Sequence, residues 1–389
     1  MTAPTAYLCT PMSDFPTADS ALLLLEDGTV FRGRPLGRRG TTTGEVCFNT
    51  GMAGYQEIFT DPSYCGQIVV TTTSHIGNYG VTGAEVESGR VQIAGLVCRE
   101  FSEFFSRQEA VGSVQEYFER AGIVGIGGVD TRALVRHVRE KGAMNAIISS
   151  EILDEAALRE RLRAVPPMSG LALAAQVSVG EAYDLLPPDG VAAHFRVAVL
   201  DLGVKQNILR HLTQRGCAVR VFPYDTPLAE MEQWAPDGYF ISNGPGDPAA
   251  TTEAIESVKG IVAREKPLFG ICLGHQMLAL AHDVPTYKMP NGHRGLNHPV
   301  KNLLTGRCEV TSQNHGFVVD AEAVAAHPEL EVTHLNLNDN TVEGLRRRDG
   351  RAFSVQYHPE SSPGPHDSHY LFDEFLALLE TAARPIVAA

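Results

Sequence analysis

The sequence has few cysteines, no long apolar run and a shortage of basic residues, and each shortage excludes a class of protein. Its seven cysteines are an odd number without metal-ligand spacing, which favours free thiols in a reducing cytosol over a disulfide framework. No apolar run approaches the roughly 20 residues of a membrane-spanning helix. Lys and Arg number 32 against 46 Asp and Glu, and a net charge of −14 provides no basic surface for phosphates. We therefore expect a cytoplasmic protein that binds neither membranes nor nucleic acids.

The chain also lacks the Gly-x-x-x-x-Gly-Lys-[Ser/Thr] loop that holds nucleotide phosphates, so we expect no cofactor and no ATP site in it. Its 389 residues, 43% of them hydrophobic, suffice for two or three domains with cores of their own. The first 19 residues contain three prolines and no basic start followed by an apolar stretch. They are predicted to be a loose tail and not a signal peptide.

Apolar periodicity predicts β structure followed by helices in the first half. Ala21–Leu25 precedes Glu26-Asp-Gly28, which predicts a strand and a turn, with residues 29–32 as the hairpin partner. Apolar residues recur at helical spacing over 114–120 and 131–141. This half is predicted to be a mixed α/β domain.

A turn-rich segment, Leu185-Leu-Pro-Pro-Asp-Gly190, marks a domain boundary. The strand-like residues 195–201 and helix-like residues 207–212 that follow begin an alternating α/β unit. We predict a tail, a first domain, a linker and a second domain over residues 1–19, 20–185, 186–194 and 195–389.

The most informative segment places a thiol at a sharp turn. In Lys266–Gln276 an apolar run ends in Gly270-Ile-Cys272-Leu-Gly274 and continues as a helix-like stretch. The two glycines remove Cβ clashes that a strained turn would create. The N-terminus of a helix favours the thiolate of Cys272, and its N–H groups can stabilise an oxyanion. Taken alone, such a cysteine is as readily a small buried hydrophobe.

A histidine and a carboxylate far downstream favour the catalytic interpretation. Ser354-Val-Gln-Tyr-His358-Pro-Glu360 reads as a strand running into His358. On an extended segment residues two apart point to the same side, so Glu360 can orient His358. Cys272, His358 and Glu360 then have the chemistry of a nucleophile, a base and an orienting acid.

A third segment, Asp237–Pro248, is a strand-like run followed by Gly244-Pro-Gly246. The glycines allow close approach of the backbone to a ligand, and their N–H groups can hold an oxyanion or a carboxylate. Alone it would be an ordinary turn. Together and in this order, the three segments indicate a site for acyl transfer.

These segments resemble a known set of signatures. Ser242–Pro248, Gly270–Gln276 and His358-Pro-Glu360 are similar to the three motifs of class I (triad-type) glutamine amidotransferases. The resemblance covers the last half of the chain. It implies a flavodoxin-like domain, a mostly parallel sheet with helices on both faces.

Further motifs narrow the resemblance to the small, glutamine-hydrolysing subunit of carbamoyl-phosphate synthase. In the second half the matching segments are Gln313–Phe317, Gly295–Val300 and Ser361–Asp367; in the first half they are Gly44–Gln56, Thr60–Tyr64, His75–Asn78 and Gly128–Arg132.

The resemblance implies that Cys272, His358 and Glu360 hydrolyse L-glutamine through a thioester. It implies a glutamine pocket made by Ser63, Gly244, Gly246, Leu273, Gln276, Asn314, Gly316 and Phe317. Ser63 lies in the first half, so this pocket would lie between the domains, where ligand clefts often occur.

The resemblance also implies a partner. A large subunit that uses ATP and Mg²⁺ would receive ammonia through an enclosed passage and make carbamoyl phosphate for arginine and pyrimidine synthesis. The assembly would be a heterodimer or an oligomer of heterodimers. The alternatives are an amidotransferase for anthranilate, GMP or CTP synthesis, a non-catalytic regulatory or scaffold subunit, and a stand-alone Cys hydrolase.

The remaining histidines are not expected to be catalytic. His275 beside the nucleophile is interpreted as a structural polar residue at the start of a helix. His293, His298 and His315 lie in Asn- and Gly-rich segments without a carboxylate or thiolate at ligand spacing, so we expect no metal site.

Overall fold

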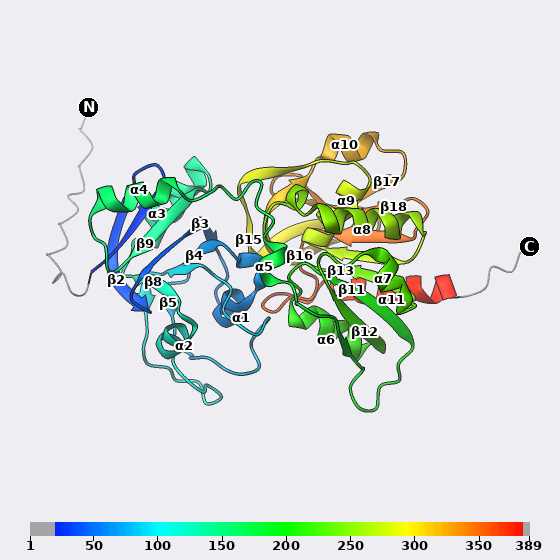
Figure 1. Ribbon diagram of the computed structural model, residues 1–389, viewed down its shortest axis with the longest axis horizontal. Helices are drawn as coiled ribbons and strands as arrows, with labels where there is room; N and C mark the ends of the chain where they lie inside the picture. The colour runs from blue at the N-terminus through cyan, green and yellow to red at the C-terminus, as the bar shows by residue number, and fades with distance from the viewer. Residues whose placement is uncertain (1–19, 384–389) are drawn as a thin grey trace, which may run out of the picture.

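The computed structural model describes residues 20–383, which form two domains side by side (Figure 1). The first domain is a closed barrel of seven strands, ordered β1-β2-β8-β6-β4-β3-β9, with a separate two-stranded sheet, β5-β7. Its elements are β1 (Ala21–Leu25), β2 (Val30–Gly37), β3 (Thr41–Asn49), α1 (Tyr55–Thr60), η2 (Pro62–Tyr64), β4 (Gln67–Thr71), β5 (His75–Ile76), β6 (Gly95–Val97), β7 (Glu100–Phe101), α2 (Val114–Ala121), β8 (Val124–Gly127), α3 (Thr131–Lys141), β9 (Asn145–Ser149) and α4 (Glu155–Arg163).

Strand β1 shows why this barrel carries helices outside it. All five of its residues are buried, because its alternate side chains enter two different cores. Leu23 joins a cluster with Leu134 of α3, whereas Leu22 joins a cluster with Leu158 of α4. The predicted hairpin of β1 with β2 and the predicted helices α2 and α3 are confirmed.

The second domain is built on a ten-stranded sheet, ordered β10-β12-β11-β13-β14-β19-β18-β17-β15-β16. Its elements, with the short helix that precedes it, are α5 (Ala174–Val177), β10 (Tyr183–Leu185), β11 (Phe195–Asp201), α6 (Gln206–Gln214), β12 (Cys217–Pro223), α7 (Leu228–Gln233), β13 (Gly238–Ile241), η3 (Pro248–Ala250), α8 (Thr252–Ala263), β14 (Leu268–Ile271), α9 (Leu273–Ala281), β15 (Thr286–Asn302), β16 (Cys308–Val319), α10 (Ala321–Ala326), β17 (Leu330–Asn336), β18 (Val342–Arg347), β19 (Ala352–Val355) and α11 (Tyr370–Ala383).

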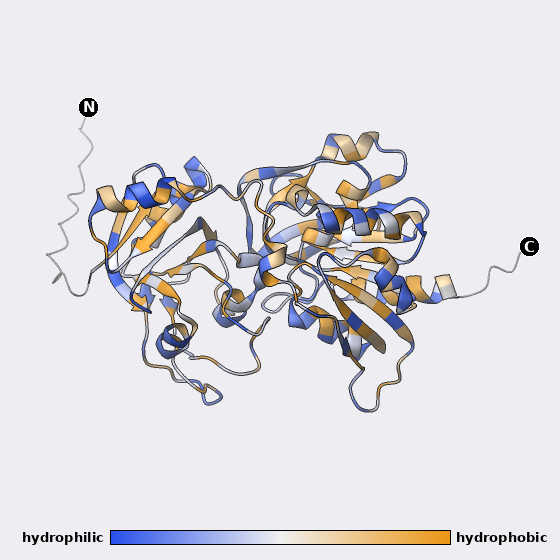
Figure 2. Ribbon diagram, in the orientation of Figure 1, coloured by the Kyte–Doolittle hydropathy of each residue, from blue (hydrophilic) through white to orange (hydrophobic). Residues whose placement is uncertain are grey.

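Helices cover both faces of this sheet, as the resemblance implied. In β11, Val199 packs in one cluster with Leu209 of α6, and Leu200 packs in another with Val258 of α8. The central strands are accordingly mostly hydrophobic in Figure 2, between helices with one polar face. The five strands from β12 to β19 in the sheet order are parallel, but the strands at both edges pair antiparallel. The sheet is therefore parallel only at its centre.

The chain enters the second domain earlier than the linker prediction implied. Residues 183–185 form β10, which pairs with β12, and Ala174 of α5 lies in the core with Leu200. Strand β10 has largely exposed side chains and is held by backbone pairing and an Asp184–Arg220 ion pair. Leu185 packs against the core of the domain, but a strand of three residues is too short for its alternation to be recognised in the sequence.

The long β15–β16 hairpin brings the second domain against the first (Figure 1). Lys288 of β15 forms an ion pair with Glu45 of β3. The backbone N–H of Ala143 donates to the carbonyl of Pro290 at 2.7 Å. The domains therefore share a polar interface beside β16. Across residues 20–383 we find no helix with the length and apolarity needed to span a membrane.

The aromatic core between β13, β14 and α11 yields a test of the second domain. Phe372 of α11 is fully buried and packs on Phe240 and Phe269. Phe372→Ala is expected to lower the free energy of unfolding by about 3–5 kcal/mol, through lost burial and the cavity left behind. Urea unfolding followed by the fluorescence of Trp234, the single tryptophan, measures this. Leu186→Ala, at a side chain 74% exposed, should change it by no more than about 0.5 kcal/mol.

Candidate active site

The nucleophile candidate lies at the junction of β14 and α9 in a strained conformation. Cys272 has φ 54° and ψ −103°, which a non-glycine residue adopts at a cost of about 1–3 kcal/mol. Its neighbouring glycines are sterically required. A Cβ on Gly270 would lie 2.6 Å from the carbonyl oxygen of Gly274, and one on Gly274 would lie 2.2 Å from that of Ile241. The strand, turn and helix predicted around Cys272 are therefore present.

His358 and Glu360 make the predicted contact, but not from an extended segment. Strand β19 ends at Val355, and a turn follows in which the N–H of Ser361 donates to the carbonyl of His358 at 3.1 Å. The N–H of His358 donates to the carbonyl of Ser312 at 2.9 Å, which ties the turn to β16. His358 Nδ1 lies 2.7 Å from Glu360 Oε1.

A buried lysine that the sequence analysis did not identify completes this arrangement. Lys205 Nζ lies 2.9 Å from Glu360 Oε1 and donates to the carbonyl of Ser361 at 2.7 Å. Lys205 follows β11, whose carboxyl end adjoins those of β13 and β14 at the edge where ligands bind in such sheets. In a sequence, a single lysine between apolar segments is usually a surface residue. Only the position of Lys205 after a central strand could have indicated that it lies at the site.

These contacts set the charges at neutral pH. Burial lowers the pKa of His358, but the Glu360 carboxylate and the nearby Cys272 thiol more than reverse this and raise it to about 10. Burial raises the pKa of Glu360, whereas Lys205 and His358 bring it down to about 2. His358 is therefore protonated and Glu360 ionised. A protonated imidazole beside a thiol favours the reactive thiolate.

A pocket between the domains opens on Cys272. Its free volume of about 20 Å³ holds about one water molecule, so a larger ligand requires pocket side chains to move. Besides Cys272 it is lined by Glu45, Ser63, Gln67, Met168, Gly244, Pro245, Gly246, Gln276, Arg294, Asn314, His315, Gly316 and Phe317.

Seven of the eight residues predicted to bind glutamine line this pocket. Leu273, the eighth, lies behind it as the first residue of α9. Its backbone N–H is among the first four of the helix, which have no partner within the helix. Gly244 must be glycine, since a Cβ there would lie 2.1 Å from the carbonyl oxygen of Leu202.

Polar contacts hold the pocket wall across the domain interface. Asn243 Nδ2 donates to Ser63 Oγ at 2.8 Å, and Asn314 Nδ2 donates to Asp61 Oδ2 at 2.9 Å. The carbonyl of Asn314 accepts from the Cys272 thiol at 3.6 Å. The first domain therefore helps to position the residues around the nucleophile.

Two charged residues of the pocket were missed by the sequence analysis. Glu45 lies in β3 of the first domain, and Arg294 lies in β15 with its Nε buried and without a partner among the described residues. Both fall inside or beside segments that carried the resemblance, but only the fold brings them together.

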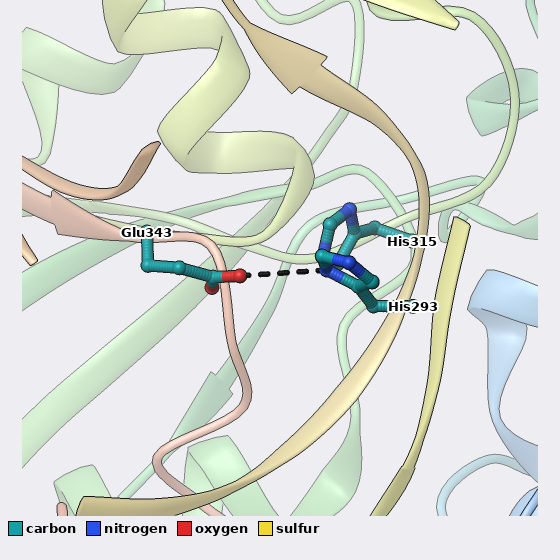
Figure 3. Close-up of side chains that lie close together, drawn as sticks. All are labelled: His293, His315 and Glu343. Atoms are coloured by element: carbon teal, nitrogen blue, oxygen red, sulfur yellow. Dashed lines mark ion pairs between the residues drawn. The ribbon is translucent and has the colours of Figure 1, made fainter. Parts of the chain in front are cut away.

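Of the other four histidines considered in the sequence, His275 is structural, His293 and His315 belong to a cluster, and the His298 ring lies 5.2 Å from that of His293. His275 is fully buried, its Nδ1 lies 2.9 Å from Ser354 Oγ, and burial lowers its pKa to about 3, which agrees with the structural role predicted. His293 and His315 lie close to Glu343, a carboxylate that sequence spacing did not associate with them (Figure 3).

The charge of Glu360 yields a direct test of this site. Glu360→Gln removes the carboxylate that raises the pKa of His358, so that pKa should fall from its value of about 10. NMR titration of protein labelled at the histidine rings measures the shift, with the His358 signal assigned through His358→Gln. Glu322→Gln, at an exposed residue, should leave the titration unchanged. An unaltered His358 titration in Glu360→Gln would contradict the arrangement.

Comparison with known proteins agrees with this geometry. The family model described as "Glutamine amidotransferase class-I" matches residues 198–378, and "Carbamoyl-phosphate synthase small chain, CPSase domain" matches residues 23–148. These matches correspond to the two domains and confirm the resemblance drawn from the motifs.

Proteins similar over nearly the whole chain bear the name carbamoyl phosphate synthase small chain. The one from Chlorobaculum tepidum is 51% identical over 362 residues, covering 92% of this chain and 98% of the relative. That from Synechococcus sp. is 50% identical, covering 92% and 93%, and that from Nostoc sp. is 48% identical, covering 97% and 99%. The chain therefore belongs to the carbamoyl phosphate synthase small-chain family, and its second half is a class I glutamine amidotransferase domain.

Proposed function

We propose that this chain hydrolyses L-glutamine to glutamate and ammonia through a thioester on Cys272. The observation that carries the proposal is a strained, buried thiol beside a histidine whose Nδ1 lies 2.7 Å from Glu360. His358 Nε2 has no hydrogen-bond partner in residues 20–383 and is free to act on the thiol or the substrate.

The chemistry follows from these groups. The Cys272 thiolate attacks the side-chain amide carbon of glutamine, and backbone N–H groups of Leu273 and Gly244 stabilise the oxyanion. Protonated His358 gives its proton to the departing nitrogen, which leaves as ammonia. Neutral His358 then takes a proton from water, whose oxygen attacks the thioester carbon. The C–S bond breaks, glutamate is released, and the thiolate is restored beside protonated His358. Glu360 and Lys205 hold the imidazole in place during both steps.

The charged residues of the pocket support an amino-acid substrate. Arg294 Nε, buried and unpartnered among the described residues, would bind the α-carboxylate. Glu45 and the oxygen of Ser63 would bind the α-ammonium group. Gln276, Asn314, Gly316, Phe317 and Gly246 would enclose the side chain.

As a small chain of carbamoyl phosphate synthase, this chain has a large-subunit partner. We propose a heterodimer, or an oligomer of heterodimers, in the cytosol, where free thiols such as those of the six cysteines within residues 20–383 persist. The large subunit would use ATP and Mg²⁺ to convert the ammonia into carbamoyl phosphate for arginine and pyrimidine synthesis. An enclosed transfer keeps ammonia unprotonated and nucleophilic.

Adjoining cavities support such a passage through this chain. Asn314 lines both the pocket at Cys272 and a second small cavity that contains His358. Ile58 lines that cavity and a third one of about 200 Å³, which reaches the 75% exposed Met52. We propose that ammonia leaves along these cavities, past Ile58.

The proposed activity is tested by glutamate release from glutamine, with and without a co-expressed large subunit, while carbamoyl phosphate is assayed. Hydrolysis should rise with the partner, yield carbamoyl phosphate and disappear in Cys272→Ser, which cannot supply a thiolate. Hydrolysis at the same rate with and without the large subunit would indicate another synthase or a stand-alone hydrolase. No hydrolysis under either condition would indicate a scaffold subunit.

The passage is tested by narrowing it. Ile58→Phe should preserve glutamine hydrolysis and synthesis from added ammonium salts, yet lower glutamine-dependent carbamoyl phosphate synthesis, because ammonia escapes before it reaches the partner. Ile58→Val, which keeps the cavity open, is the matched control. Equal coupling of hydrolysis to synthesis in both variants would contradict this route.

A further inference from the structure

A cluster of buried histidine and carboxylate side chains adjoins the pocket through His315, the one member of the cluster that lines it. His293 comes from β15, His315 from β16 and Glu343 from β18, and one potential ligand atom from each lies within 4.8 Å of those of the other two. In Figure 3 the two rings lie together and the Glu343 carboxylate points toward them. His293 Nδ1 is 3.5 Å from Glu343 Oε1.

The far nitrogen of each ring is anchored by an oxygen. His293 Nε2 lies 2.9 Å from Asp339 Oδ2, and His315 Nδ1 lies 2.9 Å from the carbonyl oxygen of Phe317. Both oxygens are acceptors, so each contact requires a proton on that far nitrogen. Metal-binding histidines are held in this way by carboxylates and carbonyls. The near nitrogens, His293 Nδ1 and His315 Nε2, which face the cluster, then carry lone pairs.

Within the cluster these lone pairs share one amide donor, Asn336 Nδ2, which lies 3.4 Å from His293 Nδ1 but donates at 2.9 Å to Glu343 Oε1. His315 Nε2 is 2.9 Å from Gln313 Oε1, so two acceptors face each other. Exchanging the oxygen and nitrogen of the Gln313 amide does not remove the conflict. The amide nitrogen donates to Glu343 Oε2 at 2.9 Å, and after the exchange the amide oxygen would face that carboxylate oxygen instead. Buried acceptors without donors are costly, and a cation between them would relieve the repulsion.

We propose that His293, His315 and Glu343 bind one divalent transition-metal ion, with Zn²⁺ the best match. Two imidazoles and a carboxylate are a common zinc ligand set. Because zinc bonds these ligands at about 2.0–2.1 Å, ligand atoms around it lie about 3.3 Å apart, close to the 3.5 Å between His293 Nδ1 and Glu343 Oε1. The three ligand atoms lie within 4.8 Å of one another, so the cluster would contract slightly around the ion. Asp339 is the outer partner that orients His293.

A metal ion bound to His315 would stabilise one wall of the pocket at Cys272. His315 lies between Asn314 and Gly316, and all three line the pocket at Cys272. A metal on His315 would tie this wall to β15 and β18. The ion would brace the pocket without contacting the reacting atoms, and the proposal stands whether or not glutamine is the substrate.

The binding test uses tag-free full-length chain, stripped with a chelator and titrated with Co²⁺ and Zn²⁺. We expect one equivalent of Co²⁺ with visible d–d absorption, displaced by Zn²⁺, and a melting temperature raised by saturating Zn²⁺. Glu343→Gln and His293→Gln should abolish this signal. Asp339→Asn, which changes only the outer partner, should weaken binding about 10- to 100-fold.

The control is another histidine–carboxylate pair of this chain. His137 Nε2 lies 2.6 Å from Asp27 in the first domain, and His137→Gln should leave the Co²⁺ signal unchanged. The melting temperature of each metal-free variant shows that it is folded. No stoichiometric binding by the natural chain, or binding equal in folded Asp339→Asn, Glu343→Gln and natural chains, would overturn the proposal.

Discussion

The site depends on one buried carboxylate. Glu360 is fully buried and contacts two cationic groups, His358 and Lys205, at 2.7 and 2.9 Å. A carboxylate there would be costly without such partners, and each partner would be costly without it. Because Lys205 follows β11 and His358 and Glu360 lie in the turn after β19, the carboxyl edge of the parallel strands must be intact before the charges balance. The imidazole beside Cys272 is thereby held in place.

The same constraint links the two domains. Burial lowers the pKa of Lys205, but Glu360 raises it, and the carboxylates of Glu87 and Asp61 in the first domain raise it further. Asp61 accepts from Asn314 beside the nucleophile. The barrel is therefore part of the active site, since removing it would leave buried charges and amides without partners.

Strand β16 contacts both the nucleophile region and the histidine–carboxylate cluster. Asn314 and Phe317 contact the nucleophile region through their carbonyls, to which Cys272 and Gln276 donate. His315 between them points into the cluster with Glu343. A bound cation in that cluster and a substrate in the pocket would both stabilise the same short segment, which makes the wall of the pocket the place where the two could be coupled.

The sequence by itself determined the local parts. Glycines at 270 and 274, an apolar strand before them and a helix after them predict the sharp turn at Cys272, because the clash that a Cβ on Gly270 would make with Gly274 is local in the chain. The clash that requires Gly274, with the carbonyl of Ile241, is set by the neighbouring strand of the fold. The His358-Pro-Glu360 motif likewise revealed the imidazole–carboxylate pair, although it is held by a turn. Apolar periodicity identified α2, α3 and β11 because each buries one stripe or both faces.

Only the tertiary structure decided which distant polar groups share a buried space. Lys205, Glu45, Arg294 and the Glu343 cluster have no local pattern, because a charge or an amide that is satisfied by a partner far along the chain looks like a surface residue in sequence. The edge strand β10 escaped detection for a related reason, since it is only three residues long and its pairing with β12 lies far along the chain. Long-range electrostatic and hydrogen-bond pairing therefore had to be seen in the fold.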